Sequence, residues 1–341
     1  MQRSAVPRPD DDGGETLFLS DADVRAALSW PEAIDAVRDA YAAPTDAAAL
    51  PPRTMARAEG TWLRTLSAMP AHCEYMGVKL IAASPPARRA SYLVALFDRR
   101  TTALLALLDG NHVTGTRTAA TSAVAIDVLA PRRPLRVAVI GSGFEAANHV
   151  AAAAAVRDIA ELAVFSPTQA NRRRFAEEAA ATHGVNVRAA TSAEDAARDA
   201  DLVLAAARSR DESPTVRGAW LRSDATVVSI GSTLPEQREV DADVIRRASV
   251  VVADVPEEVA EQTGDMIAAA AEGVDFAGKL VGLADIVAEA AELRRDADSI
   301  AVYKSVGSAL QDVTVSALCL RRARELGLGR GLGQTIEPVG K

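Results

Sequence analysis

A glycine motif near the middle of the chain has the spacing that binds nucleotide phosphates. Residues 136–140 form a short apolar run, Gly141-x-Gly143-x-x-Ala146 follows directly, and a helix-like segment comes next. In a strand–turn–helix unit the first glycine permits the tight turn, the second lets the backbone approach a pyrophosphate, and the helix start favours the phosphates. The alternative is a glycine turn that binds no nucleotide. We assign the whole turn to a cofactor site: Gly141, Ser142, Gly143, Phe144, Glu145 and Ala146.

The end of the next strand-like segment indicates which nicotinamide nucleotide the site takes. NAD-specific sites carry an acidic residue there, about 20 residues after the glycines, to bind the ribose 2′-OH, but residues 164–168 include no acid. The hydroxyls of Ser166 and Thr168 and the guanidinium of Arg172 suit a 2′-phosphate, because no carboxylate repels it. The pattern favours NADP(H), with NAD(H) possible. The other interpretation of residues 172–174 is a solvated face of a helix.

Two isolated cationic residues in small or apolar surroundings could act on an acidic substrate. Arg117 lies among the small residues 114–122, where a fixed guanidinium can bind a carboxylate through two hydrogen bonds. Lys79 lies in an apolar stretch and is one of only four lysines, whereas Lys and Arg together number 38. A half-desolvated lysine has a lowered pKa and can exchange protons near neutral pH. Taken singly, a helix-start ion pair for Arg117 and an edge-strand lysine that snorkels for Lys79 are the structural alternatives.

The elements that would position these residues divide the chain into two domains. Apolar strand-like stretches alternate with helical segments between residues 132 and 285, which predicts a Rossmann domain with a doubly wound parallel sheet. Residues 16–131 and 286–330 contain short β-like stretches and helices, including a long helix near residues 113–130. They predict one mixed α+β domain into which the Rossmann domain is inserted. Residues 1–15, rich in Pro, Asp and Gly, predict a disordered tail.

Composition restricts the class of protein. The 341 residues are 49% hydrophobic and 25% charged, as in a chain with a folded core. A net charge of −8 argues against a nucleic-acid partner. No apolar run approaches the roughly 20 residues that span a bilayer, which argues against a membrane partner. Two cysteines, and four histidines never spaced i, i+4, predict no metal site. On these observations we expect a cytoplasmic protein.

Several motifs, in their order along the chain, resemble those of the ornithine cyclodeaminase/mu-crystallin family. They are Pro52-Arg53, Met69-Pro70-Ala71, Gly77-x-Lys79, Arg117-Thr118-Ala119-Ala120, Gly141-x-Gly143 and Ser305-Val306-Gly307 with Gln311-Asp312. The resemblance runs from about residue 17 to 328 and implies a homodimer, in which the interrupted domain mediates dimerisation and binds substrate beside the Rossmann domain. It implies that Arg53 and Arg117 bind the substrate carboxylate and that Lys79, the catalytic residue, lies beside the reacting carbon. We add Ala207, Ser305 and Gly307 to the cofactor site.

One departure from the family pattern separates its activities. The family's cyclodeaminases carry an aspartate in the loop after the fifth strand, where this chain has Thr233, whose hydroxyl cannot act as a base near pH 7. We place Thr233 in the substrate site. Together with the acid-free nucleotide site, this departure predicts an NAD(P)H-dependent oxidoreductase that reduces a ketimine or imine C=N bond next to a carboxylate of a small amino or imino acid, or catalyses the reverse amino-acid oxidation. The alternatives are an ornithine or lysine cyclodeaminase, which releases ammonia with catalytic NAD, and a non-catalytic, NADP-dependent binder of a small ligand.

Overall fold

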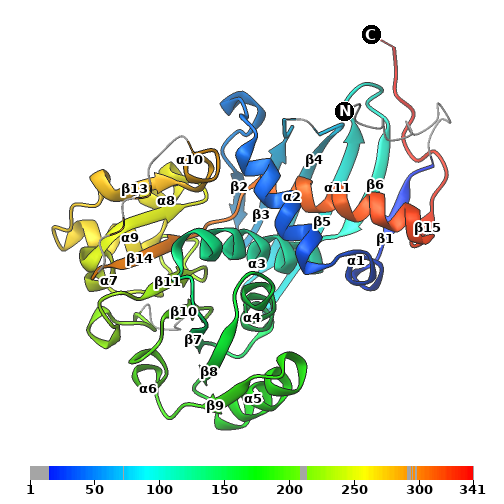
Figure 1. The fold of residues 1–341 in the computed structure, drawn as a ribbon. Coiled ribbons are helices and arrows are strands. Elements are labelled where there is room, and N and C mark those ends of the chain that lie inside the picture. The colour runs from blue at the N-terminus through cyan, green and yellow to red at the C-terminus, as the bar shows by residue number, and fades with distance from the viewer. Residues whose placement is uncertain are drawn as a thin grey trace, which may run out of the picture. The chain divides into compact units, whose positions relative to one another are not determined.

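The chain forms two compact units, each made of segments distant in sequence. The computed structural model describes residues 15–71, 73–207, 213–289, 293, 295 and 298–340, shown in Figure 1. Unit 1 comprises Met1–Leu28, Thr45–Val113 and Asp312–Lys341, and unit 2 comprises Ser29–Pro44 and Thr114–Gln311. Residues 29–44, 114–131 and 286–311, which the sequence grouped with the flanking domain, thus belong to unit 2. The predicted tail, apart from Glu15, lies outside the described residues.

Unit 1 is built on a seven-stranded mixed sheet in the order β15-β1-β6-β5-β4-β3-β2. Consecutive strands from β2 to β6 pair antiparallel, and β1 pairs parallel with β6. A capping box between Ser20 and Asp23 begins the short helix α1. The elements are β1 (Leu17–Leu19), α1 (Asp21–Ala27), a 3-10 turn (Ala47–Ala49), β2 (Thr54–Ala58), β3 (Thr61–Ala68), β4 (Tyr75–Ser84), β5 (Arg89–Asp98), β6 (Leu104–Asp109), β15 (Arg330–Gly331) and the greater part of α11 (Ala309–Leu326).

The two faces of the unit 1 sheet differ in burial. Residues of alternating strand positions, among them Leu66, Lys79 and Val94, lie on one face and are buried. Helix α11 packs there, since a Cβ built at Gly77 would lie 3.0 Å from Val313. We call this the inner face. The opposite, outer face leaves Leu63 exposed by 47%.

Unit 2 contains the predicted Rossmann-type sheet. Its eight strands are all parallel, in the order β13-β12-β14-β11-β10-β7-β8-β9. The late strand β14 lies between β11 and β12 (Figure 1). The strands are β7 (Leu135–Ile140), β8 (Ile159–Phe165), β9 (Asn186–Ala189), β10 (Leu202–Ala205), β11 (Thr226–Ser229), β12 (Ala248–Ala253), β13 (Leu280–Gly282) and β14 (Ile300–Lys304).

Helices cover this parallel sheet, as alternating strands and helices require. One continuous core joins strand residues such as Val203 and Val227 to helix residues such as Val244 and Met266. Among the described residues, no helix has both the length and the apolarity that a bilayer span requires. The helices are α2 (Trp30–Ala42), α3 (Gly110–Leu129, which begins in unit 1), α4 (Phe144–Val156), α5 (Gln169–His183), α6 (Ala193–Ala197), α7 (Ala242–Arg247), α8 (Pro256–Gln262), α9 (Gly264–Ala271) and α10 (Leu283–Val287), with 3-10 turns at Gly218–Trp220 and Ala277–Lys279.

Candidate active site

The glycine motif has the geometry that a pyrophosphate needs. Gly141 has φ +123°, and a Cβ built there would lie 2.5 Å from the carbonyl oxygen of Ala206, so that only glycine fits. At Gly143, no atom of the described residues lies within 4 Å of a built Cβ, which leaves open space over the turn. Helix α4 follows at once, and no described side chain caps its start at Gly143. Its first N–H groups can therefore meet a phosphate.

Two of the three residues predicted to recognise the ribose 2′ position, Ser166 and Arg172, contact each other at the end of β8, whereas Thr168, the third, is the N-cap residue of α5. Ser142 Oγ donates to Ser166 Oγ at 2.9 Å, which joins the glycine turn to the neighbouring strand. Arg172 Nη1 donates to the Ser166 carbonyl oxygen at 3.0 Å, and its guanidinium lies 5.5 Å from the Phe165 ring centroid. These contacts fix a cation and two hydroxyls at one strand end, an arrangement that suits a phosphate.

Lys79 is more deeply buried than the sequence predicted. Its side chain is 0% exposed, and Nζ lies 2.9 Å from Oδ1 of Asp312, which is also 0% exposed. The Tyr92 ring centroid lies 5.5 Å from Nζ. Strand β4 has β3 and β5 on its two sides, so that the edge-strand alternative is wrong. The carboxylate stabilises the ammonium form of Lys79 within unit 1.

A second buried cation of unit 1 was not predicted from the sequence, because β3 contains many polar residues. Arg64 is only 7% exposed, and its guanidinium lies 5.1 Å from the Trp62 ring centroid. Arg64 pairs in register with Ile81, two residues from Lys79, and therefore shares the inner face with it. Arg53 is half-buried and directly precedes β2.

Arg117 is held by a network of polar side chains within unit 2. The residue is 8% exposed, and Nη1 donates to Oε1 of Gln311 at 2.7 Å. The amide nitrogen of Gln311 donates in turn to the Tyr41 hydroxyl at 2.8 Å and to Asp254 at 3.1 Å. Burial raises the pKa of Tyr41 well above its usual value and the Asp254 charge acts in the same direction, so that its phenol stays neutral.

Asp254 connects that network to the Ser-Val-Gly motif. Its carboxylate accepts hydrogen bonds from Ser305 Oγ at 2.7 Å and from the backbone N–H groups of Val306 at 3.0 Å and Gly307 at 2.7 Å. Gly307 has φ +80°, and a built Cβ would overlap the Arg117 guanidinium. Gly307 of this motif therefore lies directly against the Arg117 guanidinium. The Ser305 hydroxyl, which we assigned to the cofactor site, donates its hydrogen bond to Asp254.

Two other assigned residues have partners that the sequence did not reveal. The N–H and hydroxyl of Thr233 both donate to Oε1 of Gln237, at 3.0 and 3.3 Å. The N–H of Ala207 donates to Oε1 of Glu239 at 3.1 Å. Contacts distant in sequence hold Asp254, Gln311 and Asp312, whereas the partners of Glu239 lie 8 to 32 residues away. Only the Gln311-Asp312 pair gave a signal, as part of the last family motif.

Comparison with known proteins finds a family model and individual relatives that match most of this chain. The model of the ornithine cyclodeaminase/mu-crystallin family matches residues 14–326. A Delta(1)-pyrroline-2-carboxylate reductase of Bacillus cereus is 29% identical over 270 residues, which are 77% of this chain and 81% of that relative.

Two solved structures share the fold over nearly their whole length. The Thermococcus litoralis Delta(1)-pyrroline-2-carboxylate reductase, in complex with NADH and L-proline, matches with a TM-score of 0.86 and 28% identity, covering 93% of this chain and 100% of that one. An archaeal alanine dehydrogenase dimer with bound NAD matches with a TM-score of 0.84 and 25% identity, covering 93% and 99%.

Proposed function

The chain belongs to the ornithine cyclodeaminase/mu-crystallin family, and we propose that it is a nicotinamide-dependent oxidoreductase that reduces a C=N bond next to a carboxylate, or oxidises the corresponding amino acid. The observation that carries this proposal is the buried pair of Lys79 and Asp312, which holds an ammonium proton donor on the inner face of unit 1. The reductase and dehydrogenase activities of its relatives support the same reaction class.

The chemistry divides between the cofactor and the chain's own residues. A bound reduced nicotinamide supplies the hydride that reaches the imine carbon. Arg117, with its position fixed by Gln311, binds the substrate carboxylate together with Arg53 and so orients the imine. Lys79 donates a proton to the imine nitrogen, so that hydride and proton together convert C=N to CH–NH. Gln311 and Asp312, the partners of Arg117 and Lys79, are consecutive in the sequence.

The assay that tests this reaction uses two substrate sets. With Delta(1)-pyrroline-2-carboxylate and NADPH or NADH, we expect loss of the reduced nicotinamide's near-ultraviolet absorbance and formation of an equal amount of proline. Ornithine or lysine with NAD should release no ammonia. Ammonia release would favour a cyclodeaminase, and nucleotide binding without any turnover would favour a ligand-binding protein. Either outcome overturns the proposal.

We further propose that NADP(H) is the preferred cofactor. Ser142, Ser166 and Arg172 surround the end of β8, where the ribose 2′-phosphate would lie, and no acid stands there to repel it. The remaining cofactor residues, Thr168, Ala207 and Gly307, lie at carboxyl ends of the unit 2 strands, the edge where such sheets bind nucleotides.

Arg172→Ala should discriminate between the two nucleotides. Loss of a charge-assisted contact is expected to raise the KM for NADPH by about 10-fold or more while the KM for NADH changes little. Arg174→Ala is the matched control, because Arg174 is exposed and lies 3.8 Å from Glu178 on the same helix. Steady-state kinetics with both nucleotides give the result. An equal loss with NADPH and NADH would contradict the NADP preference.

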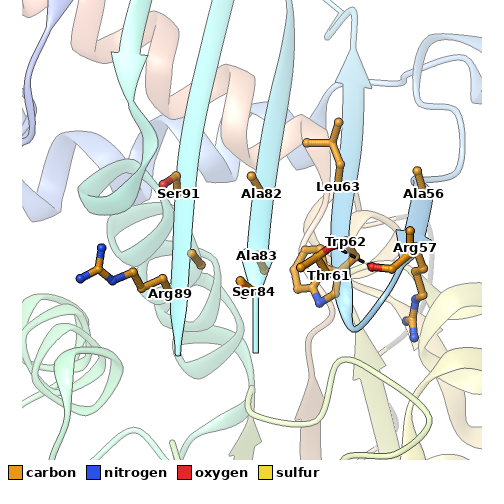
Figure 2. Close-up of a pocket in the computed structure, with 12 residues that line it drawn as sticks. Ala56, Arg57, Thr61, Trp62, Leu63, Ala82, Ala83, Ser84, Arg89 and Ser91 are labelled. Carbon is orange, nitrogen blue, oxygen red and sulfur yellow. Dashed lines mark hydrogen bonds between the residues drawn. The ribbon is translucent and has the colours of Figure 1, made fainter. Parts of the chain in front are cut away.

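We also propose a homodimer formed through the outer face of the unit 1 sheet. Figure 2 shows Ala56, Leu63, Ala82 and Ser91 in one row across β2 to β5, as their strand register requires. Small side chains beside Leu63 leave a cavity of about 510 Å³ on these strands. The occupant that we propose is a second copy of this chain. A hollowed sheet face lined mainly by small and apolar side chains, with Arg57 and Arg89 also in its lining, fits a self-complementary interface, and a similar solved structure is a dimer.

Leu63→Glu is expected to give a monomer. The glutamate would bury a charge in the interface, at a cost that a two-fold contact suffers twice. Leu326→Glu on α11 is the control, since Leu326 is 51% exposed in the same unit. Light scattering after size-exclusion chromatography measures the mass. A dimer that survives Leu63→Glu would rule out this face.

The cytoplasmic location of the protein remains a prediction.

A further inference from the structure

A cluster of charged side chains is buried inside unit 2, apart from the residues assigned above to substrate and cofactor. Glu239, Asp265 and Lys304 are each 0% exposed. Lys304 Nζ lies 3.0 Å from Oδ2 of Asp265 and donates to Ser229 Oγ at 2.9 Å. Burial of three ionisable groups costs free energy unless their contacts compensate for it. We therefore considered what function this buried cluster could have.

Glu239 connects the ends of two neighbouring strands. One carboxylate oxygen accepts the N–H of Ala207 at 3.1 Å, just after β10. The other accepts the N–H of Gly231 at 2.8 Å and the Ser229 hydroxyl at 2.7 Å, at the end of β11. A Cβ built at Gly231 would overlap Oε1 of Glu239, so that the carboxylate lies directly against this backbone.

The two loops that Glu239 holds belong to the edge of the sheet where the nucleotide is proposed to bind. Strand β10 lies between β7, which leads into the glycine turn, and β11. In register, Ala205 of β10 pairs with Ser229 of β11, which pairs with Lys304 of β14. Their carboxyl ends therefore lie side by side, at the crevice where parallel α/β sheets bind ligands.

The surroundings of Glu239 allow its charge to change near neutral pH. Burial raises the pKa of Glu239 to about 7, the ammonium of Lys304 opposes this, and the charge of Asp265 acts with burial. Asp265 also accepts the N–H groups of Glu239 at 2.7 Å and Val240 at 3.2 Å. Lys304 and Asp265 are the charged side chains that face Glu239 in the described part of unit 2.

We propose that Glu239 is a positioning residue for the nicotinamide nucleotide, whose ionised carboxylate holds the Ala207 and Gly231 backbone in the binding geometry and couples nucleotide affinity to pH. The ionised form can accept from all three donors at once. A protonated carboxyl presents an O–H to groups that are themselves donors, so that at least one contact weakens and a loop shifts. The inference rests on the proposed nicotinamide-dependent function.

Glu239→Gln tests the coupling, because glutamine keeps the shape and stays neutral at every pH. The dissociation constant of NADPH is measured by fluorescence titration from about pH 6 to about pH 8.5 for both proteins. Dividing the dissociation constant of the variant by that of the wild type cancels the pH dependence that comes from the nucleotide's own phosphate. At the high end we expect the variant to bind about 10-fold more weakly. The ratio should fall towards one as the pH falls through about 7, where wild-type Glu239 becomes protonated.

Two further variants keep the result interpretable. Glu261→Gln, at an exposed position of α8, is the matched control and should give a ratio near one at every pH. Ser229→Ala removes a hydrogen bond that stabilises the ionised form, so that the transition in affinity should move to higher pH. It also serves if Glu239→Gln does not fold.

The outcomes separate the two proposals. Two results would overturn the role of Glu239 and leave the proposed function standing. One is a wild-type affinity for NADPH that does not vary with pH beyond the nucleotide's own titration. The other is a ratio of variant to wild-type dissociation constants, for Glu239→Gln, that is constant with pH. Absence of any nucleotide binding by the wild-type protein overturns both.

Discussion

Lys79→Ala is expected to lower kcat for imine reduction by about 10²–10⁴-fold, while the dissociation constant of the nucleotide changes by less than about 2-fold. In the proposed reaction the ammonium donates the proton that the imine nitrogen takes up as hydride reaches carbon, and no other lysine lies in unit 1 among its described residues. The nucleotide is proposed to bind at unit 2, whose glycine turn the substitution leaves intact. Rapid-mixing kinetics and fluorescence titration measure the two quantities.

A loss of stability accompanies this substitution and must be separated from the loss of catalysis. Removing Lys79 leaves the carboxylate of Asp312 buried without its 2.9 Å partner. Breaking a buried ion pair in this way costs about 3–5 kcal/mol of unfolding free energy. Asp312→Asn breaks the same pair but keeps the proton donor. It should lower Tm comparably and kcat far less. Equal loss of kcat in both variants, at a temperature well below both Tm values, would contradict the proton-donor role.

Gly307→Ala is expected to raise the KM for the imino acid by about 30-fold or more. Its Cβ would overlap the Arg117 guanidinium, and displacing that group would remove the proposed contact with the substrate carboxylate, which two charge-assisted hydrogen bonds would form. Such contacts contribute about 1.5–3 kcal/mol each. Initial-rate kinetics over a range of imino-acid concentrations measure the effect.

Gly273→Ala separates this effect from backbone strain. Gly273 has φ +73°, close to the +80° of Gly307, but no described atom lies within 4 Å of its built Cβ. Both alanines suffer the left-handed strain of about 1–2 kcal/mol, and only Gly307→Ala meets Arg117. The control should lose stability and keep its KM. A Gly307→Ala enzyme with an unchanged KM would show that Arg117 does not bind the substrate.

The features that the sequence predicted are those that local patterns determine. The alternating strands and helices of unit 2 and the glycine turn depend on short stretches, in which residue spacing reports backbone geometry. The mixed sheet of unit 1 could be recognised for the same reason. The structure places α3 mostly in unit 2, whereas its sequence shows only that a helix forms there.

The partners of the reactive groups could not be predicted, because they come from distant parts of the chain. Lys79 pairs with Asp312, 233 residues away, and an apolar strand pattern does not reveal which acid meets it. Gln311 bonds to Arg117 across 194 residues. Glu239 lies in a loop that reads as polar and exposed, yet it is 0% exposed and binds three donors. Tertiary packing, which sequence periodicity does not encode, decides these contacts.

Transfer of deuterium from nicotinamide labelled at its hydride position is the most direct test of the proposed reduction. Incubation of the protein with labelled NADPH and Delta(1)-pyrroline-2-carboxylate should give proline with one deuterium on the carbon that bears the carboxylate, as read by mass spectrometry and NMR. Unlabelled proline, or consumption of the imine without oxidation of the nucleotide, would contradict direct hydride transfer to a C=N bond and with it the proposed function.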